Sequence, residues 1–255
     1  MANHITNELR IEASPERIKE ILEAIKNDEI GLGSIDFNKI IPMPPELDIE
    51  AGSRTTMAIE IYTTMKENRI RYMGEGEYDI DGEDLLKISM PEFLEKYGET
   101  IKSDPGIVKD GQQYCENTRK HGCATWYEWS IKNWGTKWNA YGFDHLQAYE
   151  EGSDTIFFQT AWSGSPQILR KISELYPNVT LHYRWADENI GYNVGTAVLN
   201  NGEVVGIYQP IRGSAEAEQL SCDILGYDPE EIITLDEQAD GAGMPCKEEG
   251  GMEIT

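Results

Sequence analysis

The chain begins with an alternation of apolar and polar residues, which is typical of a β-strand. The positions on one side of this stretch are Ile5, Asn7, Leu9 and Ile11. A Ser14-Pro15 pair follows, which joins an N-cap residue to a proline suited to the first helical position. The next apolar residues recur at helical spacing: Ile18, Ile21, Leu22 and Ile25. The pattern predicts a strand and then an amphipathic helix.

A second strand is predicted over Ile35–Ile41, and it stops at the proline cluster that starts with Pro42. The pattern then changes. Thr55–Asn68 and Pro91–Tyr97 are expected to be helices, and residues 104–120 form either a helix or a mobile loop. The acidic stretch from Glu77 resembles the start of a calcium-binding loop. Its twelfth position is Ile88, where a bidentate Glu is required, so a solvated acidic strand or turn is favoured.

Strand and helix patterns resume after Asp154. Ser165-Pro166 repeats the cap-and-proline signal ahead of a second apolar helical stripe. An Asn-Gly pair at Asn201-Gly202 predicts the tip of a β-hairpin. The strands expected here are Thr155–Thr160, Val179–Trp185, Asn193–Leu199 and Glu203–Gln209.

This order predicts an α+β fold: a ferredoxin-like split β-α-β antiparallel sheet with a long helical insertion and an extra C-terminal hairpin. Helices are expected to cover one face of the sheet. Residues 1–45 and 150–210 would form the core, and residues 46–149 the insertion. Residues 211–235 would be a C-terminal extension, and residues 236–255, rich in Gly, Asp and Glu, a disordered acidic tail.

Composition narrows the class of protein. The chain has 255 residues and a formal net charge of −24. This balance argues against direct binding of nucleic acid phosphates. No apolar run reaches the roughly 18 residues that span a bilayer, and Met1–Ile5 carries no basic or apolar leader signal. We therefore expect a cytoplasmic protein that does not contact membranes.

The charge is unevenly spread along the chain. The segment from His121 to Ala186 contains six acidic and five basic residues, so its net charge is close to neutral. An anionic ligand is best tolerated in such a region of an acidic protein. The alternative is that the acidic surface itself acts, as a mimic of DNA or as an inhibitor that binds basic partners.

Motifs for catalysis and for metals are missing. The sequence has no nucleophile elbow, P-loop, zincin or dinucleotide-binding motif, so an enzyme acting on a nucleotide is the less favoured interpretation. Cys115, His121 and Cys123 lie close together but lack a fourth ligand at workable spacing, and no C-x-x-C pair occurs. We expect free thiols, no metal and no cofactor.

Four of the six tryptophans fall within Trp126–Trp138. Tryptophans at helical spacing are usually core residues, and this interpretation stays open for Trp126, Trp129 and Trp134. The functional interpretation is a pocket in which aromatic faces stack on a ring, Asn139 reads polar edges and basic side chains meet phosphate. The candidate ligand-binding residues are Trp134, Lys137, Trp138, Asn139, Tyr141, His182 and Arg184.

Four segments of the chain together resemble the YubB-like ferredoxin-fold family, which is carried mainly by bacteriophages, plasmids and integrated elements. They are Phe37–Pro44, Trp126–Ala140, Phe158–Pro166 and Leu181–Glu188. The resemblance covers Met1 to about Gln209. It implies a ferredoxin-like domain in the C-terminal half and a bacterial host cell, and it implies no catalytic residues.

Small proteins of such mobile elements often act against host defences, which is an argument from association. We therefore expect a non-enzymatic binding protein, anti-defence in role, that sequesters a small nucleotide-like molecule at the Trp-rich segment. A host defence protein is the alternative partner, bound through the acidic surface, and a homo-oligomer is left open.

Overall fold

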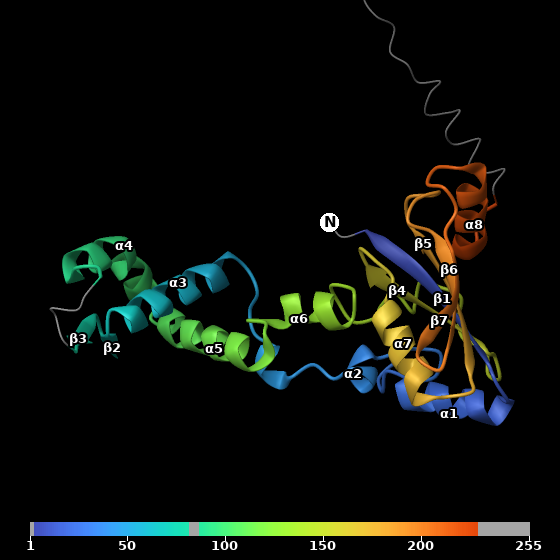
Figure 1. Ribbon diagram of the computed structural model, residues 1–255, viewed down its shortest axis with the longest axis horizontal. Coiled ribbons are helices and arrows are strands. Elements are labelled where there is room, and N and C mark those ends of the chain that lie inside the picture. Colours follow the sequence, from blue (N-terminus) through green and yellow to red (C-terminus); the bar gives the residue numbers. More distant parts are fainter. Residues whose placement is uncertain (1–2, 82–86, 229–255) are drawn as a thin grey trace, which may run out of the picture. The chain divides into compact units, whose positions relative to one another are not determined.

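The computed structural model describes residues 3–81 and 87–228 of the chain (Figure 1). It divides into two compact units. We call the first, formed by residues 1–34, 141–164 and 173–255, the sheet unit. We call the second, formed by residues 35–140 and 165–172, the helical unit. Residues 82–86 of the acidic stretch and the predicted tail at 236–255 lie outside the described residues.

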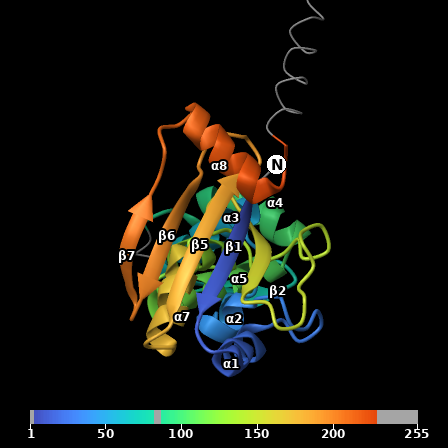
Figure 2. The same ribbon diagram turned by 90° about the vertical axis from the view of Figure 1, so that its right-hand side faces the viewer.

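The sheet unit contains a five-stranded antiparallel sheet in the order β4-β1-β5-β6-β7 (Figure 2). Its strands are β1 (His4–Glu12), β4 (Thr155–Ala161), β5 (Thr180–Asp187), β6 (Gly195–Asn200) and β7 (Glu203–Tyr208). β4 and β5 flank β1, which is antiparallel to both. The crossover from β4 to β5 over β1 is the split β-α-β arrangement. The predicted α+β class and antiparallel sheet are confirmed.

The sheet unit also contains the helices α1 (Pro15–Ile25) and α8 (Ala215–Leu225). The helix that follows β4 in the chain, α7 (Pro166–Leu175), has its residues 166–172 in the helical unit. The cap at Ser14 forms as predicted, since its side chain accepts a hydrogen bond from the backbone N–H of Arg17. No helix was predicted at α8, which Ser214 caps and which packs through Ala217 and Ile224 on Ala186 at the end of β5.

A polar side chain lies at the centre of the sheet core. Asn7 on β1 is fully buried, on the same side as Leu9. Its Nδ2 donates to the carbonyl oxygen of Phe158, at 3.1 Å, and to Oγ1 of Thr160 on β4, at 2.9 Å. Its Oδ1 accepts from the hydroxyl of Tyr183 on β5, at 2.6 Å. One amide therefore joins the three strands, and every polar atom of this set has a partner.

The helical unit consists of short helices, two longer paired helices and a hairpin. Its elements are α2 (Phe37–Ile40), the 3-10 turn η1 (Pro45–Leu47), α3 (Ser53–Glu67), β2 (Ile70–Gly74), β3 (Glu77–Ile80), α4 (Met90–Ser103), α5 (Gly106–His121) and α6 (Trp126–Asn133). Its apolar core includes Ile61, Phe93, Ile101 and Tyr114, all almost completely buried. Nowhere in residues 3–81 and 87–228 is a helix both long and apolar enough to cross a membrane.

The strand predicted over Ile35–Ile41 is wrong, because α2 occupies this segment. The side chain of Asp36 accepts from the backbone N–H of Asn38, which is an N-cap contact that starts a helix. Phe37 and Ile40 are buried at helical spacing, which the alternation of apolar residues concealed. The same segment therefore belongs to the helical unit and adds no strand to the sheet.

Three other elements of this unit can be compared with the expectations from sequence. Residues 104–120, left open between helix and loop, form α5. The helix expected at Pro91–Tyr97 continues to Ser103 as α4, and its start carries a reciprocal Ser89–Glu92 capping box. The acidic stretch begins with a strand, β3 (Glu77–Ile80), which agrees with the favoured strand or turn, and it pairs with β2 in a hairpin that was not predicted.

The backbones of α3 and α5 approach closely at Gly111. A Cβ at this position would lie 2.2 Å from the carbonyl oxygen of Ala58 and 2.8 Å from Cβ of Tyr62. Contacts this short against backbone cannot be relieved by a side-chain rotation, so only glycine fits. The helix pair therefore depends on one missing methyl group.

We predict that Gly111→Ala destabilises the helical unit by about 1–3 kcal/mol, because overpacking forces the two backbones apart. Gly98→Ala is the matched control. Its Cβ would meet only Leu94 at 3.7 Å, and replacing a mid-helix glycine should stabilise by about 0.5–1 kcal/mol. Urea denaturation followed by circular dichroism measures both, and equal stability of the two variants would contradict the close approach.

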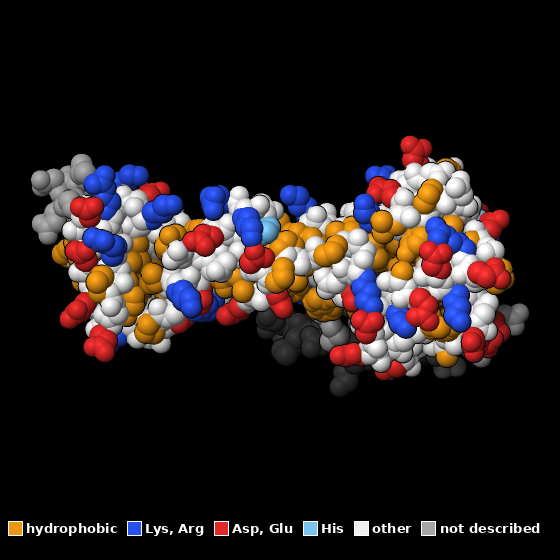
Figure 3. All heavy atoms as spheres, turned by 90° about the horizontal axis from the view of Figure 1, so that it is seen from below, with side chains coloured by type: hydrophobic (Ala, Val, Ile, Leu, Met, Phe, Trp, Pro, Cys, Tyr) orange, Lys and Arg blue, Asp and Glu red, His pale blue; other side chains and the backbone are white. Residues whose placement is uncertain are grey.

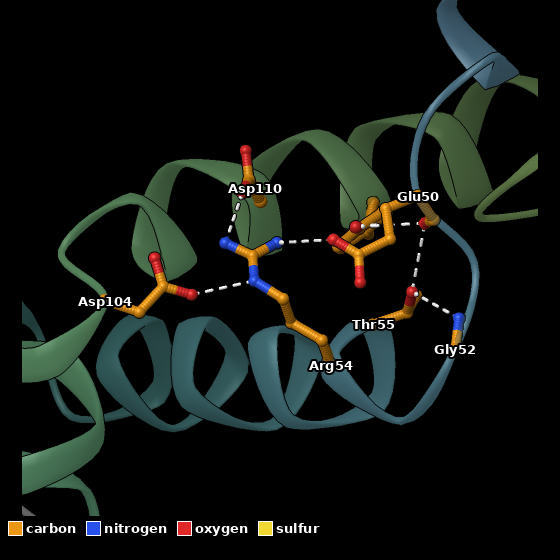
Figure 4. A network of polar contacts seen from close by, with 7 residues as sticks. Glu50, Gly52, Arg54, Thr55, Asp104 and Asp110 are labelled. Atoms are coloured by element: carbon orange, nitrogen blue, oxygen red, sulfur yellow. Dashed lines mark hydrogen bonds and ion pairs between the residues drawn. The ribbon is translucent and has the colours of Figure 1, made fainter.

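Charged side chains of opposite sign are interspersed on the surface. On the face drawn in Figure 3, Lys and Arg side chains lie among Asp and Glu side chains in each unit. One set surrounds Arg54 at the start of α3 (Figure 4). Its Nε lies 2.7 Å from Oδ2 of Asp104, and its NH2 nitrogen lies 2.7 Å from Oδ2 of Asp110. The guanidinium thus ties α3 to the beginning of α5, and it lowers the pKa of Asp104.

Arg54→Gln should destabilise the protein at neutral pH and much less in acid. The pKa of Asp104 is lower in the folded chain than in the unfolded chain. The stabilisation that the Arg54–Asp104 ion pair gives to the folded chain is therefore complete above the ordinary carboxyl pKa. It is lost as the pH falls through the pKa of Asp104 in the folded chain. Urea denaturation at about pH 7 and about pH 3 tests this. Arg71→Gln is the control, since the Arg71–Asp79 pair is 67% and 50% exposed and should contribute little.

Candidate ligand-binding site

The Trp-rich segment forms α6 and the turn after it. Thr125 caps the helix with a capping box to Glu128, and Gly135 ends it with φ +82°. Trp134 is only 4% exposed. Its ring meets Trp129 edge-on at 5.4 Å, and its indole N–H donates to the carbonyl oxygen of Ile41 at 2.9 Å. Trp134 and Trp129 are therefore core residues in this structure.

Asn139 has its side-chain amide engaged within the helical unit. Its Oδ1 accepts from the backbone N–H of Phe37 at 2.8 Å and of Ala140 at 2.9 Å. Its Nδ2 donates to Oδ1 of Asp36 at 2.7 Å. Because Asp36 is also the N-cap residue of α2, these contacts of Asn139 stabilise the beginning of that helix.

Lys137 and Trp138 form a pair at the surface. The Lys137 ammonium lies 4.6 Å from the centre of the Trp138 ring, within the range of a cation–π contact. The Trp138 side chain remains 39% exposed. Of the four candidate residues in this unit, these two keep an accessible aromatic and cationic surface.

The other candidate residues belong to the sheet unit. Tyr141 pairs with Gln159 of β4 through its backbone. His182 lies 2.7 Å from Oε2 of Glu12, a contact that lowers the pKa of this carboxyl group, and Arg184 lies 3.1 Å from Glu8. The seven candidates are thus divided between two units, and their joint role in ligand binding stays a prediction.

The sheet unit has a cleft of about 540 Å³ at the end of β5. Its size falls in the range of sites for small molecules. It is lined by Asn3, Asp187, Asn189, Tyr192, Asn193 and Arg212. Three amides, a carboxylate, a guanidinium and a phenol make this cleft polar, which suits a ligand that is itself rich in polar groups.

Sheet register places these residues together. Ile5 near the start of β1 lies opposite Asp187 at the end of β5. The backbone N–H of Glu188 donates to the carbonyl oxygen of His4 at 3.0 Å, which continues the pairing by one residue. Asn3 therefore comes beside the loop that leaves β5. The long β1–β5 pairing, rather than the loop itself, positions this end of the cleft.

Asp187 organises the loop after β5. The residue is only 5% exposed. Its Oδ1 accepts from the backbone N–H of Asn189 at 2.9 Å, from the Asn189 side-chain amide at 3.1 Å and from Asn3 Nδ2 at 3.4 Å. All three bonds reach the same oxygen, so Oδ2 has no hydrogen-bond partner among the described residues. A ligand N–H or O–H group can take that position.

Arg212 lines the same cleft as this carboxylate. Its guanidinium carbon is 4.3 Å from the centre of the Tyr192 ring, a cation–π contact. The two chain segments are joined at Gly191, whose carbonyl oxygen accepts from the N–H of Gly213 at 2.9 Å. Gly191 has φ +77°, and a Cβ there would lie 3.0 Å from Glu218. The left-handed φ therefore favours glycine here, and a larger residue would also require the Glu218 side chain to shift.

Trp162, directly after β4, lies beside the same loop. Its φ is +71°, an unusual backbone conformation for a bulky residue. Its N–H donates to the carbonyl oxygen of Asn3 at 2.9 Å, and its own carbonyl oxygen accepts from Asn193 Nδ2 at 3.5 Å. The side chain is 42% exposed. Backbone strain of this kind is concentrated at functional sites.

This cleft was not among the sites predicted from the sequence. Its signal is the run Asp187–Asn193, in which Asp, Asn and Gly follow a strand and the two Asn side chains line one cavity. Arg212 comes from a segment that had been assigned to a C-terminal extension, and no pattern in the sequence connects it to Tyr192. In residues 3–81 and 87–228, no three His, Cys, Asp or Glu side chains converge to hold a metal ion.

The cleft thus lies in a domain with an antiparallel sheet and a split β-α-β crossover, which is the ferredoxin-like class. Residues 133–228 match a family model described as a ferredoxin-like domain in Api92-like protein. The match includes every residue that lines the cleft except Asn3, and it confirms a ferredoxin-like domain in the C-terminal half. The narrower resemblance to the YubB-like family stays a prediction.

Comparison with solved structures finds the crystal structure of a protein api92 from Yersinia pseudotuberculosis. The two chains are 9% identical, and the alignment covers 84% of this chain and 100% of that chain. The TM-score is 0.36, and a similarity at this level carries no structural argument. No curated protein matches the sequence.

Proposed function

We propose that the protein binds a small nucleotide-like molecule in the cleft at the end of β5 and does not transform it. The observation that carries this proposal is that one cleft holds both Oδ2 of Asp187, which lacks a partner among the described residues, and the cation–π pair of Arg212 and Tyr192. Together they offer an acceptor, a cation and a flat surface within about 540 Å³.

Each group suits one part of a nucleotide. The Asp187 carboxylate accepts from an amino or imino N–H on the edge of a base. The guanidinium plane of Arg212 stacks on a base or forms two parallel hydrogen bonds with a phosphate. The amides of Asn189 and Asn193 donate to carbonyl or ring acceptors. Together these side chains can bind the polar ring of a base and its anionic phosphate group.

The position differs from the one expected from the sequence. Trp134 and Asn139 use their polar groups for contacts within the helical unit. Lys137 and Trp138 remain an alternative binding site at the Trp-rich segment. Variants of Trp138 and of Tyr192 distinguish this site from the cleft at the end of β5.

The resemblance to the YubB-like family is also part of this proposal. A YubB-like protein of a phage or other mobile element would use such a cleft to sequester a nucleotide signal of host defence. The alternative of an acidic inhibitor or DNA mimic is less well supported. Basic side chains lie among the acids on the face drawn in Figure 3, and ion pairs such as Glu8–Arg184 neutralise part of the acidic surface.

A thermal-shift assay against nucleotides, cyclic dinucleotides and ADP-ribose derivatives tests the proposal. A ligand at 100 times its dissociation constant should stabilise the folded chain by about 2.7 kcal/mol, which is a shift of several degrees at this size. Tyr192→Ala and Arg212→Gln should each weaken binding at least about tenfold, because each removes a contact with the ligand, and a tenfold loss corresponds to about 1.4 kcal/mol. Chromatography should recover the ligand unchanged.

Two control variants make the outcome specific. Tyr227→Ala removes an exposed tyrosine of the same unit outside the cleft, and it should bind like the unaltered chain. Trp138→Ala should also bind normally. Loss of binding in Trp138→Ala with normal binding in Tyr192→Ala would move the site to the Trp-rich segment, and the absence of any shift would refute a nucleotide ligand.

A further inference from the structure

A second pocket, of about 510 Å³, lies in the helical unit where α3 runs into β2, beside α5 (Figure 1). Three cationic side chains line it: Lys66, Arg69 and Arg71. Asp81 is the one acidic residue among those that line this pocket. In a chain with a formal net charge of −24, a pocket in which cations outnumber acids is an exception. The local charge therefore favours an anion.

Two of these cations have no partner in the described part of the protein. Within residues 3–81 and 87–228, the side chains of Lys66 and Arg69 form neither an ion pair nor a hydrogen bond. The third, Arg71, lies 2.7 Å from Asp79, but the two side chains are 67% and 50% exposed, so water screens this pair. Arg54 of the same unit is by contrast held by two carboxylates. The cations of the pocket are thus available to a ligand.

Arg69 occupies a backbone position at which glycine is usual. It follows Asn68, the C-cap residue of α3, and has φ +54°. Helices commonly end with a left-handed glycine at this position, because a Cβ is crowded there. No ion pair or hydrogen bond of the Arg69 side chain within residues 3–81 and 87–228 offsets this cost. Residues held in such conformations are concentrated at functional sites.

The rest of the pocket supplies an apolar base and hydroxyl groups. Met65 and Ile70 are 3% and 4% exposed and belong to the core of the helical unit. Tyr62 and Tyr72 line the pocket and are half-buried. Burial raises the pKa of Tyr62, so its hydroxyl stays protonated at neutral pH and can donate a hydrogen bond to an anion.

A phosphate group is the anion that suits these donors. A guanidinium forms two parallel hydrogen bonds with phosphate oxygens, and an ammonium contributes a compact charge. Lys66 lies in the last turn of α3, where the negative end of the helix dipole opposes an anion, so a single cation would not be enough. Three cations around about 510 Å³ fit a ligand that carries more than one phosphate group.

We propose that Lys66, Arg69 and Arg71 form a binding site for a small molecule with two linked phosphate groups. The site lies wholly within the helical unit, whereas the cleft of the proposed function belongs to the sheet unit. The phosphate site neither requires that cleft nor assigns a ligand to it.

Isothermal titration calorimetry of the full chain with inorganic pyrophosphate, at low salt and without divalent cations, tests this site. Pyrophosphate should bind, and added salt should weaken binding because it screens the attraction between opposite charges. Lys66→Gln and Arg69→Gly should each raise the dissociation constant at least about tenfold, because each removes a charge-assisted contact with the ligand.

Arg119→Gln is the matched control. Arg119 is an exposed cation of α5 that does not line the pocket, and its substitution changes the net charge as Lys66→Gln does. This variant should bind pyrophosphate like the unaltered chain. An equal loss of binding in Arg119→Gln and in Lys66→Gln would overturn the proposal, because overall charge alone would then attract the anion.

Arg69→Gly separates ligand binding from a role in the fold. Glycine adopts the left-handed conformation without a Cβ clash, so the midpoint of urea denaturation should rise while pyrophosphate binding weakens. A lower midpoint together with unchanged binding would overturn the proposal, because Arg69 would then serve the fold.

Arg212→Gln distinguishes the phosphate site from the cleft of the sheet unit. Binding of pyrophosphate should be unchanged in this variant. Binding that is lost in Arg212→Gln but kept in Lys66→Gln and Arg69→Gly overturns the proposal and places the anion in the cleft. An unaltered chain that binds no pyrophosphate at low salt also overturns it, and the proposed function of the cleft is then unaffected.

Discussion

The arrangement of the sheet unit depends on how its central strand is held. β1 has a neighbour on each side, and Asn7 at its middle donates to β4 and accepts from Tyr183 of β5. A buried amide leaves little freedom of register, because a shift by one residue would turn Asn7 to the other face of the sheet and leave its buried partners on β4 and β5 without their hydrogen bonds. Gly164 adds to this constraint, since a Cβ there would lie 2.1 Å from the Tyr183 hydroxyl. The same hydroxyl thus limits both the sheet register and the loop after β4.

The candidate cleft follows from that register. With β1 held between β4 and β5, the chain just before β1, the loop after β4 and the loop after β5 meet at one end of the sheet. Asn3, Trp162 and Asp187 then come together without any of them being close in sequence. Asp187 extends the order into its loop by capping the backbone at Asn189. A rigid strand thus supports a loop that carries the polar groups, which is the usual division between scaffold and site.

Local patterns predicted the elements better than they predicted the site. The strand at the N-terminus, the capped helix after it and the Asn-Gly hairpin each express a short-range rule, and the structure contains all three. Ile35–Ile41 misled because its apolar residues satisfy both periods, and only the cap at Asp36 decides for a helix. Asn139 had been assigned to a ligand, yet its amide completes that same cap region. Which partner a polar side chain takes depends on contacts far along the chain, and no local pattern records them.

Net charge limits where this chain can bind anything negative or any copy of itself. A molecule with an excess of 24 negative charges repels anions and other copies over most of its surface. The end of the sheet at Arg212 and the uncharged stretch Val204–Ile211 are two places where that repulsion is locally relieved, by a guanidinium in one case and by the absence of charge in the other. The two places are successive in sequence, since β7 leads directly into the segment that carries Ile211 and Arg212. In an acidic chain, the places that lack negative charge therefore indicate where it can bind. Both of these places lie at the C-terminal edge of the same sheet.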